Sequence, residues 1–473
     1  MNLLATKSIE RLLAEAESKG GGLKRTLTGL QLVLLGIGAI IGAGIFTLTG
    51  VAASNHAGPA VVYAFILAAV GCAFAGLCYS EFSTMIPIAG SAYTYAYATM
   101  GEIIAWIIGW ALVLEYAVGA ATVSVSWSAT FVSILKDFGI EFPHSIVASP
   151  YDPTPGSLNL VAVLILIAIS TILIVGIQES AKFNSLIVVV KVTVVVLFIG
   201  LGYTYINHSN YTPFLPENTT GQFGKFGWSG VLAAAGQIFF AYIGFDAVST
   251  AAQEAKNPKR DMPIGIIGSL AICTVLYILY AMVLTGVVNY KELNVAAPLA
   301  VAVDRMNDMP WLGKLMKLGS LAGLTSVMLV MLLGQSRVFY SMSRDGLLPK
   351  TFSTLHPKFF TPYLSNIILM IFVSIGAAFT PIAQLGNLTS IGTLFAFVLV
   401  CIAIIIMRKS QPNLPRPFKT PLVPLVPILG VISNFALMYG LDSLTWTAFL
   451  IWMAIGLVIY FTYSKNHSRV NAE

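Results

Sequence analysis

Long apolar stretches separated by short polar segments repeat along the whole chain. Between Arg25 and Glu81 no lysine, arginine, aspartate or glutamate interrupts the apolar pattern, and about 20 residues suffice for one helical span of a bilayer. Because lipid offers no partner for an open backbone edge, these stretches are predicted to be helices. The sequence therefore predicts an all-α polytopic membrane protein with 12 transmembrane helices, at about 28–55, 59–86, 101–133, 158–178, 183–206, 228–253, 262–289, 317–343, 363–380, 385–407, 422–440 and 444–463.

The composition agrees with a membrane protein. Hydrophobic residues make up 57% of the 473 residues and charged residues only 10%, and a soluble core of this length would not enclose so much apolar surface. Lysine and arginine gather between alternate stretches and at both ends of the chain. The positive-inside rule then predicts a multi-pass protein of the cell (plasma or inner) membrane with cytoplasmic N- and C-termini. The net charge of +6 is thus interpreted as anchoring charge, and no nucleic-acid partner is expected.

No connecting segment is long enough for a separate soluble domain. The predicted organisation is a cytoplasmic amphipathic N-terminal segment, a single membrane transport domain and a cytoplasmic tail, at 1–26, 27–464 and 465–473. The first to fifth stretches are spaced like the sixth to tenth, which predicts a five-plus-five inverted repeat. Its halves are placed at about 28–206 and 228–407, followed by two extra helices over 422–463.

Glycines cluster inside the first and sixth stretches, around 36–44 and 236–244. Interrupted helices at corresponding positions of two repeats mark a binding site near the bilayer midplane, although close helix packing through small residues is an alternative interpretation. The free N–H groups after such an interruption attract a carboxylate, and the released carbonyls accept bonds from an ammonium group. Together they describe a site for an α-amino acid.

The residues predicted to bind substrate follow from these two interruptions. They are Ile40, Ile41, Gly42, Ala43 and Gly44 in the first stretch, and Phe240, Ala241, Ile243 and Phe245 in the sixth. Gly244 and Asp246 are given structural roles at the sixth-stretch interruption. Gly244 supplies backbone freedom. Asp246 is predicted to cap the helix that follows, with a direct role in substrate or proton binding as the alternative.

Two further ionisable residues lie deep in apolar stretches. Glu115, in the middle of the third stretch, is predicted to line the site or exchange protons, with a structural hydrogen bond as the alternative. Lys191 lies in the apolar run 187–196. Either its amine snorkels to the membrane interface, or it contacts first-stretch carbonyls and hydroxyls such as Thr325 or Ser326. In the second case, loss of its proton would loosen the fifth stretch against the first and couple protons to transport.

Several motifs resemble those of the amino acid–polyamine–organocation superfamily, in particular its bacterial, cationic amino acid transporter-like branch. They lie at 38–46, 79–82, 87–93, 240–246, 254–258 and 343–349. The resemblance implies the five-plus-five fold with unwound helices 1 and 6. It also implies proton coupling, because bacterial relatives carry a lysine in the fifth helix where sodium-driven relatives bind the ion, and Lys191 matches that position.

The predicted function is that of a proton-coupled amino acid symporter, importing small neutral and/or cationic L-amino acids by alternating access, rather than an enzyme. Its expected partners are the amino acid substrate and the lipid bilayer, while further small membrane-protein or lipid partners are left open. Protons are the coupling ion, and neither a cofactor nor a metal site is expected. Two alternatives are an amino acid sensor or receptor without flux, and a proton-translocating subunit of a membrane complex.

Overall fold

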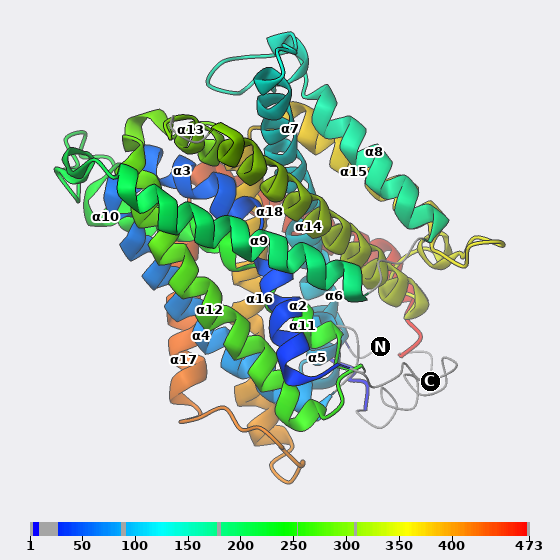
Figure 1. The fold of residues 1–473 in the computed structure, drawn as a ribbon. Coiled ribbons are helices and arrows are strands. Elements are labelled where there is room, and N and C mark those ends of the chain that lie inside the picture. Colours follow the sequence, from blue (N-terminus) through cyan, green and yellow to red (C-terminus); the bar gives the residue numbers. More distant parts are fainter. Residues whose placement is uncertain are drawn as a thin grey trace.

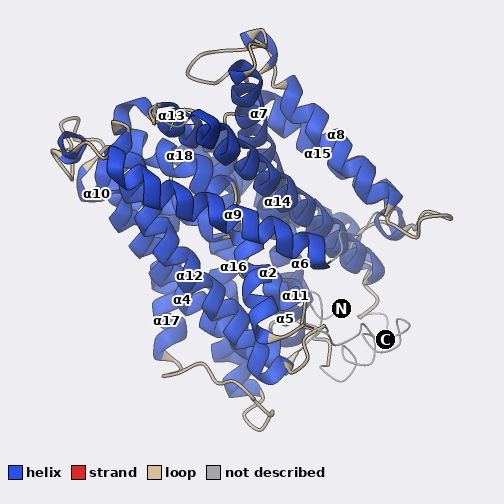
Figure 2. Ribbon diagram, viewed as in Figure 1, coloured by secondary structure: helices blue, strands red, loops and turns tan. Residues whose placement is uncertain are grey.

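The computed structural model describes residues 3–8, 27–86, 91–176, 181–252, 254–306 and 310–470. Within these ranges the chain folds into helices joined by loops, and no β-strand occurs (Figure 2). The all-α prediction is therefore confirmed for this part of the chain. Most of the predicted N-terminal amphipathic segment, residues 9–26, lies outside the described residues, as does the very end of the predicted tail, 471–473.

Eight helical segments of the described chain are long and apolar enough to cross a membrane. They are Gly44–Met85, Glu102–Asp137, Ser185–Tyr205, Gly227–Ser249, Pro258–Val287, Trp311–Arg344, Ile382–Ser410 and Ser443–His467. Four shorter apolar helices lie at Gly29–Ile40, Leu160–Val175, Tyr363–Phe379 and Leu425–Tyr439. Every predicted stretch thus contains an apolar helix, while the division into 12 crossings stays a prediction.

Local sequence signals explain where several helices begin and end. Helix α2 (Gly29–Ile40) starts with a capping box, in which the Thr28 and Gln31 side chains each bond the other residue's backbone N–H. Helix α8 (Leu160–Val175) begins after Asn159, whose side chain accepts a bond from a backbone N–H of the first turn, and ends at Gly176 in the left-handed conformation. These caps satisfy backbone groups that an apolar helix end would otherwise leave unpaired.

One group of helices consists of α2, α4 (Val61–Met85), α10 (Gly227–Ile238) and α12 (Pro258–Val287). Helix α12 packs along both α2 and α4, and α10 packs against α4 (Figure 1). The apolar side chains that these helices bury belong to one core extending through the molecule. Two regions far apart in sequence, 29–85 and 227–287, are thereby brought together.

A second group of helices lies beside the first. Helix α14 (Pro310–Arg344) packs along α7 (Gly119–Asp137), and α15 (Tyr363–Phe379) packs along α8. Helix α9 (Ala181–Gly202) contacts α14 as well as α2 and α12, so it connects the two groups (Figure 1).

Three C-terminal helices complete the bundle. Helix α16 (Ile382–Ser410) packs against α4 and against the helix that α6 (Glu102–Val113), η4 (Leu114–Val118) and α7 form together. Helix α17 (Leu425–Tyr439) packs on α16 and α4, and α18 (Ser443–Ile459) packs on α16 and α6.

The two ends of the described chain lie on the same face. Lys7 forms an ion pair with Asp345 at 2.6 Å, and the backbone N–H of Arg469 donates to the carbonyl of Asp345 at 3.1 Å. The short helix α13 (Pro298–Asp304) lies at the opposite end of the bundle (Figure 1). It packs against the second half of the interrupted first helix, where the ring of Pro298 lies against Gly50.

Candidate functional site

The helix that begins with α2 is interrupted after Ile40. Ile41 is extended, with φ −72° and ψ 107°, and helical structure resumes at Ala43, passing into a π-helical turn at Gly44–Leu48. We call residues 41–42 the first break. A helix that starts anew leaves its first N–H groups without partners inside the helix, so the predicted donors of residues 42–44 lie at such a start. The predicted interruption of the first helix is confirmed.

The helix that begins with α10 is also interrupted. It tightens into a 3₁₀ turn at Phe239–Tyr242, then Ile243 turns the chain with φ −59° and ψ 134°. Gly244 has φ +117°, and a short helical turn, α11, follows at Ala247–Thr250. We call residues 243–246 the second break. This interruption was predicted as well, and it is confirmed.

The two breaks are in contact. A Cβ atom built on Gly44 would overlap the Cα of Ala241, and a Cβ atom on Gly244 would lie 2.8 Å from the backbone carbonyl carbon and oxygen of Ala39. Each glycine therefore allows one interrupted helix to approach the backbone of the other. Donors and acceptors from two distant segments meet at this point of the bundle.

A tyrosine from α12 joins the two breaks. The hydroxyl of Tyr277 lies 3.0 Å from the carbonyl oxygen of Ile40 and 2.9 Å from that of Ala241. Its side chain is completely buried. Both carbonyls were predicted to face a substrate ammonium group, whereas their partner in this structure is a protein hydroxyl that the sequence analysis missed. The only available signal was the position of Tyr277 within an apolar helix, since a buried tyrosine hydroxyl needs a partner.

Lys191 contacts the first interrupted helix, as predicted. Its side chain is fully buried, and its amine donates a 2.6 Å hydrogen bond to the carbonyl oxygen of Gly38, two residues before the end of α2. Snorkelling to the membrane interface is thus excluded by the direction and burial of this side chain.

Helix α14 meets Lys191 through a glycine. A Cβ atom on Gly323 would lie 2.9 Å from Cγ of the lysine. The predicted hydroxyl partners are engaged elsewhere or have no partner. The Thr325 hydroxyl donates to the Leu321 carbonyl and accepts from Trp127. The Ser326 hydroxyl is buried without a hydrogen-bond partner among the described residues. The eighth predicted helix was the correct neighbour of Lys191, and the backbone space at Gly323 is what admits the lysine stem.

Glu115 and Asp246 bring two carboxyl groups close together. Glu115 lies in the π-helical turn η4 and is fully buried. Its carboxyl group faces that of Asp246 and the hydroxyl of Thr393, yet neither oxygen has a partner in hydrogen-bond geometry among the described residues. Such an arrangement places an acid with free acceptor capacity beside the second break.

The predicted capping role of Asp246 is wrong in this structure. Its side chain makes no capping bond to α11. Instead, one carboxylate oxygen accepts a 3.2 Å bond from the hydroxyl of Tyr116. Because α11 directly continues a tight turn, its backbone N–H groups already bond to carbonyls of the turn, such as Ala247 N–H to Gly244 and Ser249 N–H to Asp246.

The aromatic residues of the sixth predicted helix differ in their surroundings. Phe240 is almost fully buried next to the second break. The ring of Phe245 packs edge-on against Tyr79 of α4 at 5.9 Å and lies 5.0 Å from the ring of Phe397 of α16. Phe245 therefore joins the second break to two neighbouring helices, and any role in substrate selection stays a prediction.

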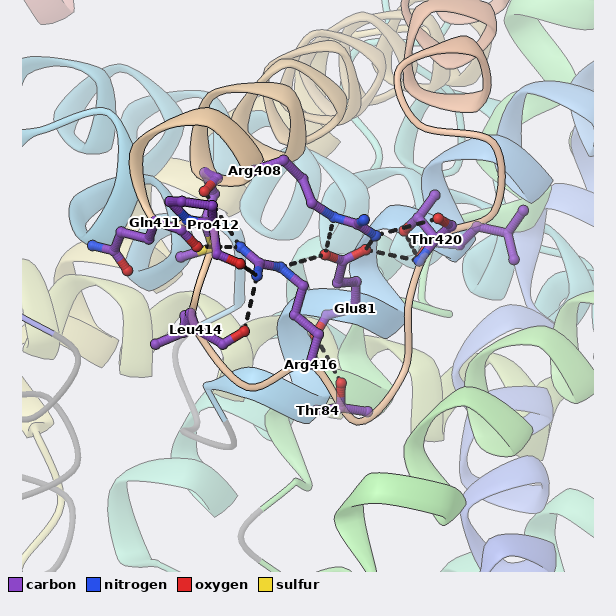
Figure 3. Close-up of polar contacts among 10 residues, drawn as sticks. Glu81, Thr84, Arg408, Gln411, Pro412, Leu414, Arg416 and Thr420 are labelled. Atoms are coloured by element: carbon purple, nitrogen blue, oxygen red, sulfur yellow. Dashed lines mark hydrogen bonds and ion pairs between the residues drawn. The ribbon is translucent and has the colours of Figure 1, made fainter.

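Glu81 fixes the end of α4 to the segment that follows α16 (Figure 3). The buried carboxylate accepts two bonds from Arg408, at 2.8 and 2.7 Å, and one from the backbone N–H of Thr420 at 2.7 Å. Arg416 approaches the same carboxylate at 3.2 Å. Bidentate pairing with arginine is geometrically demanding, so this cluster holds α16 and α4 in one relative position near the chain termini.

The fold and the site define a multi-pass helical membrane protein with two broken helices in contact. Comparison with known proteins agrees: the profile of a family described as amino acid permease matches residues 27–465. The chain is 42% identical over 470 residues to the methylthioribose transporter of Bacillus subtilis, covering 99% of each protein. It is 44% identical over 468 residues to the branched-chain amino acid permease BcaP of the same species, covering 98% of each. Cationic amino acid transporter 1 of Arabidopsis thaliana is 30% identical, over 97% of this chain and 86% of that protein.

The chain therefore belongs to the amino acid permease family, and the predicted membership of the amino acid–polyamine–organocation superfamily is confirmed. It is a multi-pass membrane transporter rather than an enzyme.

Proposed function

We propose that this protein is a proton-coupled amino acid symporter that works by alternating access. The observation that carries the proposal is the contact between the two breaks, where Gly44 and Ala241 meet. Helix-start N–H groups at residues 42–44 offer a site for a carboxylate. We expect the ammonium group to be received by carbonyls of Ile40, Ile41, Phe240, Ala241 and Ile243. Those of Ile40 and Ala241 converge on Tyr277, and a carbonyl that already accepts one bond retains a second lone pair.

The substrates we propose are small neutral and/or cationic L-amino acids. The two relatives named for branched-chain and cationic amino acids support an amino acid substrate, and Glu115 offers a carboxyl group to a cationic side chain. The methylthioribose transporter resembles this chain about as closely as the branched-chain amino acid permease does, with 42% against 44% identity. Methylthioribose carries neither an ammonium nor a carboxylate group, so the backbone donors and acceptors at the breaks favour the amino acid as substrate.

The coupling ion we propose is the proton, held at Lys191. The amine bonds the Gly38 carbonyl just before the first break. Deprotonation would remove a positive donor and weaken the attachment of α9 to α2, so the two conformations of a carrier would differ in proton affinity. The carboxyl pair of Glu115 and Asp246 offers a second place for a proton, because two carboxylates so close together disfavour double ionisation.

We also propose 12 spans arranged as a five-plus-five inverted repeat. Pairing α2 with α10 and α4 with α12 makes two packing contacts equivalent, because α2 packs on α12 and α10 packs on α4. Pairing α9 with α16, and the helix that contains η4 with α14, makes two further contacts equivalent: α9 packs on α14, and α16 packs on η4. The distribution of lysine and arginine supports cytoplasmic termini in the cell membrane.

Counterflow in proteoliposomes tests the proposed function. Purified protein is reconstituted with unlabelled L-alanine, L-leucine or L-arginine inside, and entry of the same radiolabelled amino acid is followed with and without an inwardly directed proton gradient. We expect exchange of at least one amino acid without the gradient, and accumulation when the gradient is applied. Methylthioribose serves as the competing substrate.

Each alternative gives a different result in this assay. A sensor would bind an amino acid without exchanging it, and a subunit of a proton-translocating complex would neither bind nor exchange one. Exchange of methylthioribose alone would refute the amino acid proposal. Exchange of an amino acid without any response to the gradient would refute proton coupling only.

A further inference from the structure

Tyr277 occupies a position that the proposed function leaves without a role. Its hydroxyl bridges the carbonyls of Ile40 and Ala241, which come from the two broken helices. These residues are 237 and 36 positions away from Tyr277 in the sequence. The bridge therefore depends on two separate packing contacts, that of α12 against α2 and that of the 3₁₀ turn Phe239–Tyr242 against the π-helical turn Gly44–Leu48.

The hydroxyl group cannot fully satisfy both acceptors. A tyrosine hydroxyl carries one hydrogen and thus donates one strong bond at a time, while each carbonyl oxygen offers two lone pairs. The two distances of 3.0 and 2.9 Å are nearly equal. Acceptor capacity consequently remains on both oxygens, and an ammonium group has three hydrogens with which to use it.

The ring of Tyr277 is held independently of its hydroxyl. It lies 5.5 Å from the ring of Phe65 and 5.5 Å from that of Tyr242, in a buried aromatic group. Replacing the tyrosine by phenylalanine would therefore retain the packing and remove only the bridge. Tyr242 provides a matched control, because its hydroxyl is equally buried but donates to the carbonyl of Phe65 in α4, at 3.1 Å.

We propose that Tyr277 is a positioning residue for the ammonium end of the substrate. By bridging Ile40 and Ala241 it sets the separation of the two carbonyls that receive the ammonium group. The carboxylate end, at the N–H groups after the first break, does not depend on it. This inference rests on the proposed amino acid substrate and names the protein group that orders one end of it.

The test compares an amino acid with its 2-hydroxy acid, which has a hydroxyl group in place of the ammonium. The probes are L-alanine and L-lactate, or L-leucine and L-2-hydroxyisocaproate, according to which amino acid the wild type exchanges. Half-inhibitory concentrations of both probes are measured in the counterflow assay for wild type, Tyr277→Phe and Tyr242→Phe. The maximal exchange rate and the thermal unfolding midpoint are measured in parallel.

We expect Tyr277→Phe to raise the half-inhibitory concentration of the amino acid about tenfold, the equivalent of ~1.4 kcal/mol. The half-inhibitory concentration of the hydroxy acid should stay within about twofold of the wild-type value. The maximal exchange rate should change by less than about threefold, since substrate affinity rather than gate movement is affected. In Tyr242→Phe, the ratio of the half-inhibitory concentrations of the two probes should equal that of the wild type.

Four results would overturn the inference. Equal weakening of both probes, or the same change of ratio in Tyr242→Phe, would make the hydroxyl a general structural element. Wild-type inhibition by both probes in Tyr277→Phe would remove the hydroxyl from the substrate site. Failure of Tyr277→Phe to fold while Tyr242→Phe folds would assign the bridge to fold stability. A wild type that exchanges no amino acid would instead refute the proposed function itself.

Discussion

The first and second breaks are in contact, but their glycines meet different needs. Ile41 turns the first break with φ −72° and ψ 107°, angles open to any residue, and Gly44 is required only because it lies against Ala241. Gly244 in the second break has φ +117° and also lies against Ala39. A side chain there would bring both backbone strain and steric overlap.

The attachments of the two breaks differ as well. The first interrupted helix is held by the amine of Lys191, at the Gly38 carbonyl, while the second is joined to the third predicted helix through Tyr116 and Asp246. The geometry of the first break can therefore respond to the protonation of a lysine. The geometry of the second break is fixed mainly by its backbone. We therefore expect substitutions at the first break to act more strongly on coupling, and substitutions at Gly244 to act more strongly on stability.

The largest effect is expected for Gly44→Val. Its side chain would overlap the backbone of Ala241, so the breaks would separate and the carboxylate site would be lost. We expect counterflow to fall at least about 100-fold, because overlap with backbone costs several kcal/mol. Gly200→Val in α9 is the control, since a Cβ atom there meets nothing within 4 Å. Wild-type binding by Gly44→Val would show that the carboxylate lies elsewhere.

Gly244→Ala is expected to lower stability more than it changes coupling. An alanine at φ +117° costs roughly 1–3 kcal/mol through strain alone, and its Cβ atom lies 2.8 Å from Ala39. Thermal unfolding of the purified protein should shift down by several degrees, with about tenfold less exchange. Gly139→Ala is the control: Gly139 has φ +77° and open space around it, so this variant measures the cost of backbone strain without steric overlap. An unshifted unfolding midpoint for Gly244→Ala would contradict the backbone role of the second break.

Lys191→Met tests whether the first break carries the coupling. Methionine retains an unbranched stem against Gly323 but cannot donate to the Gly38 carbonyl. We expect gradient-driven accumulation to fall about tenfold, while exchange without a gradient falls no more than about threefold. Both are measured in the same batch of proteoliposomes, so that reconstitution efficiency cancels. Accumulation equal to that of the wild type would exclude Lys191 from the coupling mechanism.

The smallest effect is expected for Gly42→Ala, which lies in the first break itself. A Cβ atom there would lie 3.2 Å from a methyl group of Val327, a side chain that is able to shift. Substrate affinity should stay within about twofold of wild type, a change below ~0.5 kcal/mol. A loss of counterflow as large as that of Gly44→Val would mean that the backbone conformation at residue 42 also requires glycine.

Much of the fold and part of the site could be predicted from local patterns. Apolar runs locate the helices because lipid requires a continuous apolar surface. Glycine clusters predicted both breaks, and a lysine among valines predicted a buried amine at the first interrupted helix. In each case the signal and its cause lie within a few residues of each other.

The missed residues depend on contacts between distant segments. Tyr277 reaches a carbonyl 237 residues away, and Arg408 pairs with a glutamate 327 residues away. A tyrosine in an apolar helix or an arginine at a helix end has many possible partners, and the sequence does not choose among them. The capping prediction for Asp246 failed because the N–H groups of α11 already bond to carbonyls of the preceding turn, and a tyrosine from the third predicted helix donates to the carboxylate instead.

The sequence by itself determined that this chain forms apolar helices, which two of them are interrupted, and that a lysine is buried beside the first. These properties follow from hydrophobic periodicity and from the conformational freedom of glycine, both of which act locally. Only the tertiary structure decided that the two breaks touch at Gly44 and Ala241 and that Tyr277 bridges them. Those contacts arise from the packing of the two interrupted helices against each other and of α12 against α2, since helix packing selects one partner for each buried polar group among all that are chemically suitable.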